Sequence, residues 1–347
     1  MITVGPGWQK IVGHDWAVRL LHLAIDKDRV GHAYLITGPD QIGKMTLART
    51  FAQALNCTAD EIGQRPCGKC RACTLIAGNR HPDVRVVLPE VSERGIRSIK
   101  IEQIRQLQQD LSLSAYEARY KIALLKRFDT ANVNAANAFL KTLEEPPANV
   151  ILILTAADSE SLLPTIISRC RVLTLRPIPT PFIEESLMTR WQVKTNQANL
   201  LAHLAGGRIG WAIEASSEPA LLQSRTTSLD RLSEALQGNL VARFNLAERL
   251  SRKSENLPVM MQTWSCWWRD LALLAFDRRS QERISNIDQI EGLHKLAGVW
   301  PSQDILRSLV QTERAMTLLK KNANARLVLE NVFLTYPAID PDFVASK

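Results

Sequence analysis

A glycine-bearing loop between an apolar run and a helix-forming segment constrains this chain more than any other feature. Residues 33–37 (AYLIT) form a short apolar run, which predicts a buried strand, and residues 46–55 have the composition of a helix. In a phosphate-binding loop placed between such elements, backbone N–H groups and the helix N-terminus face the phosphates. The order of strand, loop and helix therefore predicts an α/β phosphate-loop domain. Its candidate nucleotide-binding residues are Gly38, Gly43, Lys44 and Thr46.

The groups that would hold magnesium are missing or displaced. A working loop carries Ser or Thr directly after the lysine, because that hydroxyl ligates magnesium. Here the position is occupied by Met45, and the hydroxyl of Thr46 comes one residue late. The next expected strand is followed by Lys126 and Arg127, where a motor protein has acidic residues that orient magnesium and water. Asp129 comes too late along the chain to be assigned that role.

A third expected strand, residues 150–155, ends without a clear phosphate-sensing residue. It is followed by Ala156 and Ala157, whose methyl groups cannot bind phosphate, and Thr155 is the remaining candidate. Together with the missing magnesium groups, this pattern predicts a nucleotide-binding fold that has lost hydrolysis. Whether the chain still binds ATP or another nucleotide stays open.

Four of the six cysteines fall within one 17-residue window with the spacing C-x9-C-x2-C-x2-C. Thiolates spaced in this way can converge tetrahedrally on zinc, and nothing suggests an open coordination position, so we predict a structural zinc. Disulfides, an iron–sulfur cluster and unrelated thiols are the alternatives. We interpret the nearby His81 as a loop residue. The predicted ligands are Cys57, Cys67, Cys70 and Cys73.

Several segments, in a fixed order, resemble the AAA+ clamp-loader subunits of bacterial DNA polymerase III. The resemblance covers about the first 215 residues with specific motifs, and a helical pattern over residues 319–330 is similar to the collar domain of that family. The broken nucleotide motifs favour the delta prime branch of the family over the gamma/tau motors. The segments that carry the resemblance are Ile11–His14, Arg29–Leu35, the four cysteines, Ala138–Pro147 and Ser168–Cys170.

The resemblance implies a function for the chain as a whole. It implies a non-hydrolysing stator in a hetero-oligomeric ring with gamma/tau and delta subunits. The assembled ring would use ATP to load the sliding clamp onto primed DNA in the cytoplasm. The resemblance also implies that Arg169 is an arginine finger, which reaches in trans into the ATP site of a neighbouring subunit. Arg208 would touch nucleotide held by this chain, or else would face solvent.

The predicted organisation is an α/β domain followed by helical domains. We expect an AAA+ phosphate-loop domain over residues 1–176 with the zinc knuckle inserted at 57–73, because three prolines within 177–181 mark a linker. A small helical lid is expected over 177–217 and a helical collar for oligomerisation over 218–347.

Two local patterns have competing interpretations. Trp264, Trp267 and Trp268 share one helix face, which favours a buried packing stripe over a base-stacking platform. Glu144 and Glu145 resemble a catalytic carboxylate pair, but the two prolines that follow favour a role at a helix end or an interface.

Composition limits the remaining function classes. The 347 residues are enough for two or three domains, and no run approaches ~18 apolar residues, so no membrane span is expected. Residues 1–7 do not form a basic segment followed by an apolar one, so no secretory signal is expected. The net charge of +8 is compatible with a polyanionic partner without requiring one. Two alternative functions stay open: an active gamma/tau-type clamp-loader ATPase, and a zinc-knuckle DNA-binding protein on an AAA+ scaffold.

Overall fold

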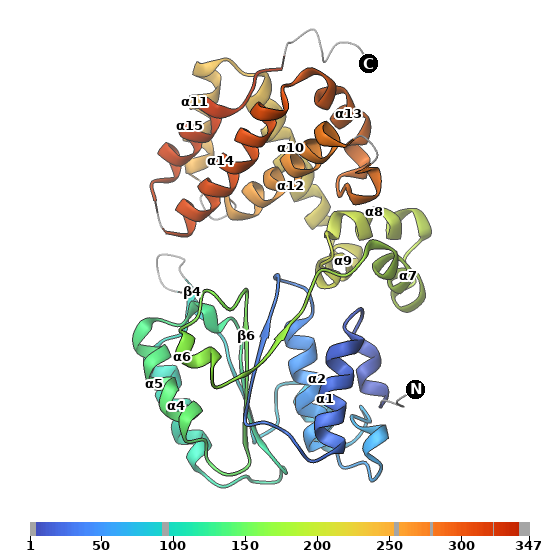
Figure 1. Ribbon diagram of the computed structural model, residues 1–347, viewed down its shortest axis with the longest axis vertical. Helices are drawn as coiled ribbons and strands as arrows, with labels where there is room; N and C mark the ends of the chain where they lie inside the picture. Colours follow the sequence, from blue (N-terminus) through green and yellow to red (C-terminus); the bar gives the residue numbers. More distant parts are fainter. Residues whose placement is uncertain (1–4, 92–96, 253–256, 278–279, 322, 340–347) are drawn as a thin grey trace. The chain divides into compact units, whose positions relative to one another are not determined.

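The computed structural model describes residues 5–91, 97–252, 257–277, 280–321 and 323–339. The chain divides into two compact units (Figure 1). One is an α/β unit made by Met1–Ser186 and Gly207–Trp211, and the other is a helical unit made by Leu187–Gly206 and Ala212–Lys347. No helix among the described residues combines the length and the apolar character that crossing a membrane requires.

The α/β unit is built on a sheet of five parallel strands in the order β2-β5-β6-β1-β7. Strands buried on both faces of a parallel sheet are continuously apolar, and the central strand β6 is buried along its whole length. The strands are β1 (Ala33–Thr37), β2 (Val84–Val87), β5 (Lys121–Leu125), β6 (Val150–Ala156) and β7 (Arg171–Thr174).

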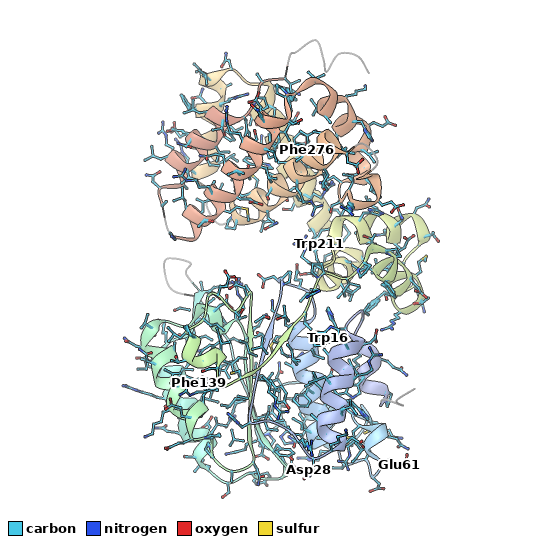
Figure 2. All side chains as sticks on the ribbon, in the orientation of Figure 1. Trp16, Asp28, Glu61, Phe139, Trp211 and Phe276 are labelled. Atoms are coloured by element: carbon cyan, nitrogen blue, oxygen red, sulfur yellow. The ribbon has the colours of Figure 1, made fainter. Side chains whose placement is uncertain are left out.

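Helices cover both faces of this sheet (Figure 1). Side chains alternate along β1, so that Tyr34 and Ile36 pack with the helices α1 and α2, whereas Ala33 and Leu35 pack with α4 and α5. Phe139 of α5, labelled in Figure 2, is fully buried in the second layer. The bounds of these helices are α1 (Asp15–Asp26), α2 (Lys44–Asn56), α4 (Ile101–Ser112), α5 (Val133–Glu144) and α6 (Pro164–Ile167).

Shorter elements complete the α/β unit. The segment between α2 and β2 contains the short helices η2 (Ile62–Gln64) and α3 (Arg71–Ala77), and η1 (Pro6–Lys10) precedes α1. A two-stranded antiparallel pair, β3 (Glu90–Val91) and β4 (Arg97–Ser98), precedes α4. The turn η3 (Phe128–Thr130) follows β5 and starts the return to α5.

The sheet order places the glycine loop at the carboxyl edge of the sheet. The loop leaves β1 between β6 and β7, where the N–H of Gly38 donates to the carbonyl of Ala157 at 3.1 Å. Ligands of open α/β sheets bind outside the carboxyl ends of the strands. The predicted α/β plus all-α architecture with a phosphate loop is therefore confirmed.

Three helices follow β7, namely α7 (Thr180–Trp191), α8 (Thr195–Ala205) and α9 (Ile209–Ser217). They occupy the range expected for a helical lid, but the compact units assign them partly to each unit. The predicted domain boundaries at 176 and 217 stay predictions.

The rest of the helical unit packs around an aromatic core. Trp264 and Trp268 are fully buried, Trp267 is 7% exposed, and the Trp264 indole donates to the carbonyl of Ser228 at 2.7 Å. The prediction of a packing stripe is confirmed. The helices are α10 (Pro219–Gln237), α11 (Leu240–Ser251), α12 (Leu257–Phe276), α13 (Ile290–Val299), α14 (Ser302–Lys320) and α15 (Ala325–Thr335), with the short turns η5 (Ser280–Arg283) and η6 (Ile287–Gln289).

The helical pattern over residues 319–330 is divided between two helices. Helix α14 ends at Lys320 and α15 begins at Ala325, because the side chain of Asn324 accepts the N–H of Leu327 at 3.2 Å and starts a new helix.

A buried arginine holds the last described segment of this unit. Arg243 of α11 is 5% exposed, and its guanidinium donates to the carbonyls of Phe333 (2.8 Å), Tyr336 (2.7 Å) and Pro337 (3.1 Å). It also donates to Gly238 at 3.0 Å. One cation thus satisfies carbonyls that the ends of α10 and α15 would leave unpaired.

Candidate functional site

The lysine of the glycine loop is bonded to its own loop. Lys44 is the first residue of α2, its side chain is 7% exposed, and its ammonium donates to the carbonyls of Gly38 and Pro39, the latter at 2.8 Å. The Oδ1 atom of Asp40 lies 3.7 Å from the same nitrogen. Burial lowers the pKa of Lys44, although Asp40 and Asp129 oppose this effect. The groups around the lysine are therefore oxygen acceptors supplied by the chain itself.

The two glycines of the loop are required by its backbone. Gly43 has φ 108° and Gly38 has φ 141°, in a region that residues with a side chain rarely adopt. A Cβ at Gly38 would lie 2.5 Å from the carbonyl oxygen of Leu175. Both glycines therefore preserve the shape of the loop, whether or not a phosphate is bound.

Arg127 lies beside the loop lysine, where an acidic residue was the expectation for a motor protein. Its Nη1 is 3.7 Å from Asp40 Oδ2, and its Nη2 is 3.5 Å from Asp129 Oδ2. Sequence reasoning did not assign Asp129, yet its side chain is only 9% exposed and its negative charge acts on Lys44. The site therefore contains two cations, Lys44 and Arg127. They lie next to the two carboxylates of Asp40 and Asp129.

The backbone at Arg127 explains how Asp129 reaches the site. Arg127 has a left-handed conformation, with φ 53°, which turns the chain into η3 directly after β5. Its N–H donates to the hydroxyl of Thr155 at 3.0 Å. Thr155, considered above as a phosphate sensor, is 1% exposed, and its hydroxyl braces this turn.

The residues after the lysine offer no hydroxyl to the loop. The side chain of Met45 packs against the hydrophobic core on the α2 face of the sheet, and Thr46 is exposed on α2. Successive helix residues point about 100° apart, so Thr46 cannot take the place of Met45. The assignment of Thr46 to a nucleotide site stays a prediction.

Two segments distant in sequence support the loop. The buried His14 has its Nε2 3.2 Å from the carbonyl oxygen of Ile42, so the ring nitrogen must donate, and burial lowers the pKa of this histidine. At the start of α9, the N–H of Gly210 donates to the carbonyl of Gln41 at 2.7 Å.

Arg208 directly precedes α9. Its guanidinium carbon lies 5.8 Å from the ring centroid of Trp211. The structure thus attaches Arg208 to a segment that contacts the glycine loop. Its contact with nucleotide stays a prediction.

The four predicted zinc ligands come together. The sulfur atoms of the cluster all lie within 4.8 Å of one another, and the Sγ atoms of Cys70 and Cys57 are 3.9 Å apart. Four Zn–S bonds of ~2.3 Å in a tetrahedron separate sulfurs by about 3.8 Å, whereas a disulfide bond would require ~2.05 Å. All four thiols are free, so their geometry fits a metal better than two disulfides.

Backbone N–H groups surround these sulfurs. The N–H of Cys67 points at the sulfur of Cys57, and that of Cys70 at the sulfur of Cys67, both at 3.3 Å. Burial raises the pKa of Cys57 and Cys73. Burial also acts to raise the pKa of Cys70, but N–H groups of Thr58 and Cys73 outweigh it and set the value at about 6. The N–H donors thus favour the thiolate form of Cys70, whereas burial disfavours the thiolate forms of Cys57 and Cys73 when no cation is bound.

The cysteine knuckle, residues 57–73, is fastened to α2 and to the N-terminal segment. Gln53 of α2 donates to the carbonyl of Cys73 at 2.7 Å, and the Trp8 indole donates to the carbonyl of Arg65 at 3.0 Å. His81 lies outside the four-sulfur cluster, and its Nδ1 accepts the N–H of Asp83 at 3.1 Å.

Arg169 follows α6 in the layer on the opposite face of the sheet from α2. Its Nη2 lies 2.7 Å from Glu144 Oε1, and its Nη1 donates to the carbonyl of Thr165 at 2.9 Å and lies 3.3 Å from the hydroxyl of Ser168. The described contacts of Arg169 do not include the glycine loop. Burial raises the pKa of the neighbouring Cys170 to about 12, which disfavours its reactive thiolate form.

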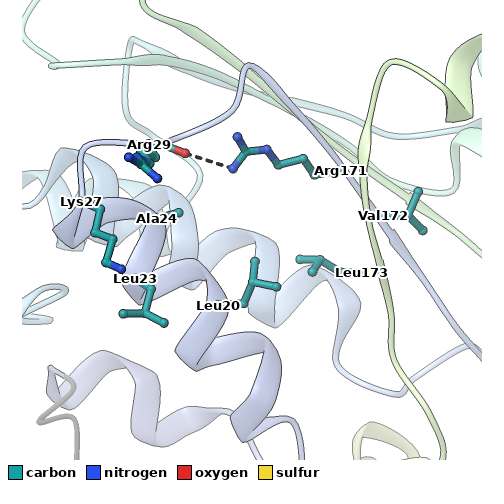
Figure 3. Close-up of a pocket in the computed structure, with 8 residues that line it drawn as sticks. All are labelled: Leu20, Leu23, Ala24, Lys27, Arg29, Arg171, Val172 and Leu173. Atoms are coloured by element: carbon teal, nitrogen blue, oxygen red, sulfur yellow. Dashed lines mark hydrogen bonds between the residues drawn. The ribbon is translucent and has the colours of Figure 1, made fainter.

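A shallow depression of about 400 Å³ lies between α1 and the edge strand β7 (Figure 3). Arg171 donates to the carbonyl of Arg29 at 3.0 Å at one end of it. The eight residues drawn there include no carboxylate, thiol or hydroxyl, so the loop, the knuckle and Arg169 remain the candidate functional features.

Comparison with known proteins gives consistent results. Residues 13–179 match the family model described as DNA polymerase III, delta subunit. The chain is 31% identical to the DNA polymerase III subunit delta' of Pseudomonas aeruginosa, over 89% of this chain and 92% of that protein. It is 29% identical to the subunit delta' of Bacillus subtilis, over 91% of this chain and 94% of that protein. It is also 31% identical to the subunit gamma/tau of Mycobacterium tuberculosis, over 52% of this chain and 30% of that protein.

Proposed function

The chain belongs to the family of DNA polymerase III delta' subunits, and from this premise we propose that it is a clamp-loader subunit that does not itself hydrolyse ATP. In this proposal it serves as a rigid stator in a ring with gamma/tau and delta subunits. The assembled ring loads the sliding clamp onto primed DNA in the cytoplasm. The chain's own contribution to the chemistry is an arginine supplied to a neighbouring subunit.

The observation that carries this proposal is that the cations of the loop are paired with the chain itself. Lys44 donates to the carbonyls of Gly38 and Pro39, and Arg127 is paired with Asp40 and Asp129. Phosphoryl transfer needs magnesium held by a hydroxyl and a carboxylate, together with a group that orients the attacking water. Met45 supplies no hydroxyl, and the carboxylate of Asp129 is paired with Arg127.

The position of Arg169 supports a role in trans. Its side chain is 34% exposed, and it belongs to the sheet face away from its own glycine loop. A guanidinium carries five N–H donors in a plane and remains charged at every physiological pH, which suits a phosphoryl group in its transition state. We propose that Arg169 stabilises that charge in the ATP site of the adjoining subunit.

The knuckle supports a structural role for zinc. Cys57, Cys67, Cys70 and Cys73 would hold the ion, which would cross-link α2, α3 and the loop between them. With four thiolate ligands the ion has no open position, so it supplies no chemistry to a substrate. The proposed role is to keep this insertion folded against α2.

A reconstituted clamp loader tests the finger. Arg169→Ala should lower ATP turnover at the adjoining site by about 10- to 1000-fold, whereas the assembly of the ring should persist. Arg169→Lys should not restore full turnover, because a point charge cannot reproduce a planar fork. The assay needs complexes with one working motor site at a time, since the other sites would hide the loss. Unchanged turnover at the adjoining site would refute the finger.

A second measurement tests the absence of hydrolysis. The isolated chain should show no magnesium-dependent ATP turnover above that of its Lys44→Ala variant. Turnover that Lys44→Ala abolishes would instead support a gamma/tau-type ATPase. Weak nucleotide binding alone would leave the proposal intact, because Gly38, Gly43 and Lys44 are still present.

A further inference from the structure

We propose that Glu144 is a positioning residue for Arg169, which fixes the plane of the guanidinium before the neighbouring site is engaged; this inference rests on the proposed finger role. Glu144 is the last residue of α5, and its Oε1 lies 2.7 Å from Arg169 Nη2. From the other side, Nη1 donates to the carbonyl of Thr165 in α6 at 2.9 Å. Two helices thus hold one side chain.

Stability does not explain this ion pair. The Glu144 side chain is 48% exposed, and pairs exposed to this degree contribute little to folding. A carboxylate in the last turn of a helix also faces the negative end of the helix dipole, which disfavours it. A residue that breaks a local preference without a gain in stability is typical of a functional site. The partner of Glu144 is the arginine that the family resemblance singles out.

The geometry leaves part of the guanidinium available. Arg169 offers five N–H donors. In the described contacts, Nη2 contacts Glu144, and Nη1 contacts Thr165 and Ser168. The remaining donors lie in the plane that these contacts fix. A long side chain that is already oriented loses less conformational freedom when a phosphoryl group arrives. Glu144 therefore favours the transition state at the adjoining site without touching it.

The charge of Glu144 has an opposite effect that the experiment must separate. A carboxylate beside Arg169 weakens the field that the arginine exerts on phosphate. Gln in place of Glu keeps an acceptor oxygen for Nη2 but removes the charge, whereas Ala removes both. If orientation dominates, Glu144→Gln stays active and Glu144→Ala does not. If charge masking dominates, both variants turn over faster than wild type, which would overturn the proposal.

The test uses the reconstituted clamp loader with one working site next to this subunit. Glu144→Ala should lower kcat for ATP at that site by about 3- to 30-fold and leave KM within about twofold, because ATP is held by the neighbour. Glu144→Gln should stay within about twofold of wild type. Glu145→Ala, the adjacent exposed glutamate, is the matched control and should also stay within about twofold.

A double variant separates this inference from the finger role itself. Glu144→Ala combined with Arg169→Ala should be no slower than Arg169→Ala alone, because Glu144 acts only through the arginine. A further loss in the double variant, or wild-type kcat in Glu144→Ala, would overturn the positioning role. If Arg169→Ala itself keeps wild-type turnover, the finger role fails and the positioning role fails with it. A loss in Arg169→Ala without a loss in Glu144→Ala refutes only the positioning role.

Discussion

The two ends of helix α2 carry two sites of very different completeness. At its N-terminus, the loop keeps the glycines and the lysine of a phosphate site, but its charged groups are paired with one another. Near its C-terminus, Gln53 anchors a knuckle in which four cysteine sulfurs lie close enough together to hold a metal ion.

Some residues of a motif are needed for the backbone fold, and others are needed for the chemistry, and the two sites separate these groups. Gly38 and Gly43 are needed for the backbone path of the loop, since a side chain at Gly38 would collide with the carbonyl of Leu175. Met45 stands where a working loop has a magnesium-binding hydroxyl, and Arg127 stands where a motor protein has an acidic residue. Neither replacement disturbs the path of the loop backbone. In the knuckle, by contrast, the proposed ligands are also the residues that would hold the segment together, so we expect that fold and chemistry cannot be separated there.

The largest effect is expected from a substitution in the cysteine knuckle. Cys70→Ser should abolish binding of one zinc per chain and lower the melting temperature of the protein by about 10 °C, because a ligand that binds only the folded state stabilises it by several kcal/mol. Metal analysis and thermal unfolding with and without a chelator would measure this. Cys266→Ser, outside the cluster, is the control and should keep full zinc content.

Two disulfide bonds among the four knuckle cysteines, in place of a bound metal, would contradict the zinc prediction. Thiol titration of the unfolded protein distinguishes the cases, since the metal site yields four reactive thiols from the knuckle after chelation, whereas two disulfides yield none.

A smaller effect is expected at the loop end. Met45→Thr restores the missing hydroxyl but should not restore magnesium-dependent ATP turnover, because the carboxylate of Asp129 is still paired with Arg127. The loss of apolar contacts from Met45 should cost about 1–2 kcal/mol of stability. Turnover assays and chemical denaturation measure the two quantities. Robust hydrolysis by the single variant would mean that the remaining residues form a nearly competent site.

The smallest effect is expected for Thr46→Ala. The hydroxyl is exposed on α2, and its loss should change the free energy of unfolding by less than about 0.5 kcal/mol. Any nucleotide binding by the isolated chain should be unchanged within about twofold. A clear loss of nucleotide affinity in equilibrium binding would instead show that Thr46 belongs to the site.

Much of the fold could be predicted from local patterns. Apolar runs gave three of the strands, the glycine loop gave the start of α2, and cysteine spacing gave the cluster that the structure brings together. These signals are strong because each depends on residues that lie near one another in the chain. The break between α14 and α15 was missed, although Asn324 is a common helix-capping residue.

The ion pairs around the sites could not be predicted in this way. Asp129 reaches Arg127 only because Arg127 adopts a left-handed conformation, which its residue type does not favour. Glu144 and Arg169 were both noticed in the sequence, but their pairing depends on how α5 and α6 pack, which no local pattern encodes. Contacts of this kind follow from tertiary structure alone.

The buried Arg243 has a consequence for the order in which this protein can fold during synthesis. Its guanidinium finds its acceptors at Phe333, Tyr336 and Pro337, about ninety residues further along the chain. Until these residues leave the ribosome, the carbonyl of Gly238 is available to the guanidinium but these three acceptors are not, so that burial of the cation would leave several of its N–H groups unpaired, which is costly. The strands and the cysteine knuckle of the α/β unit are complete far earlier in translation. The helical unit therefore closes last, and a chain that is truncated before Phe333 should carry a folded α/β unit beside an open helical one.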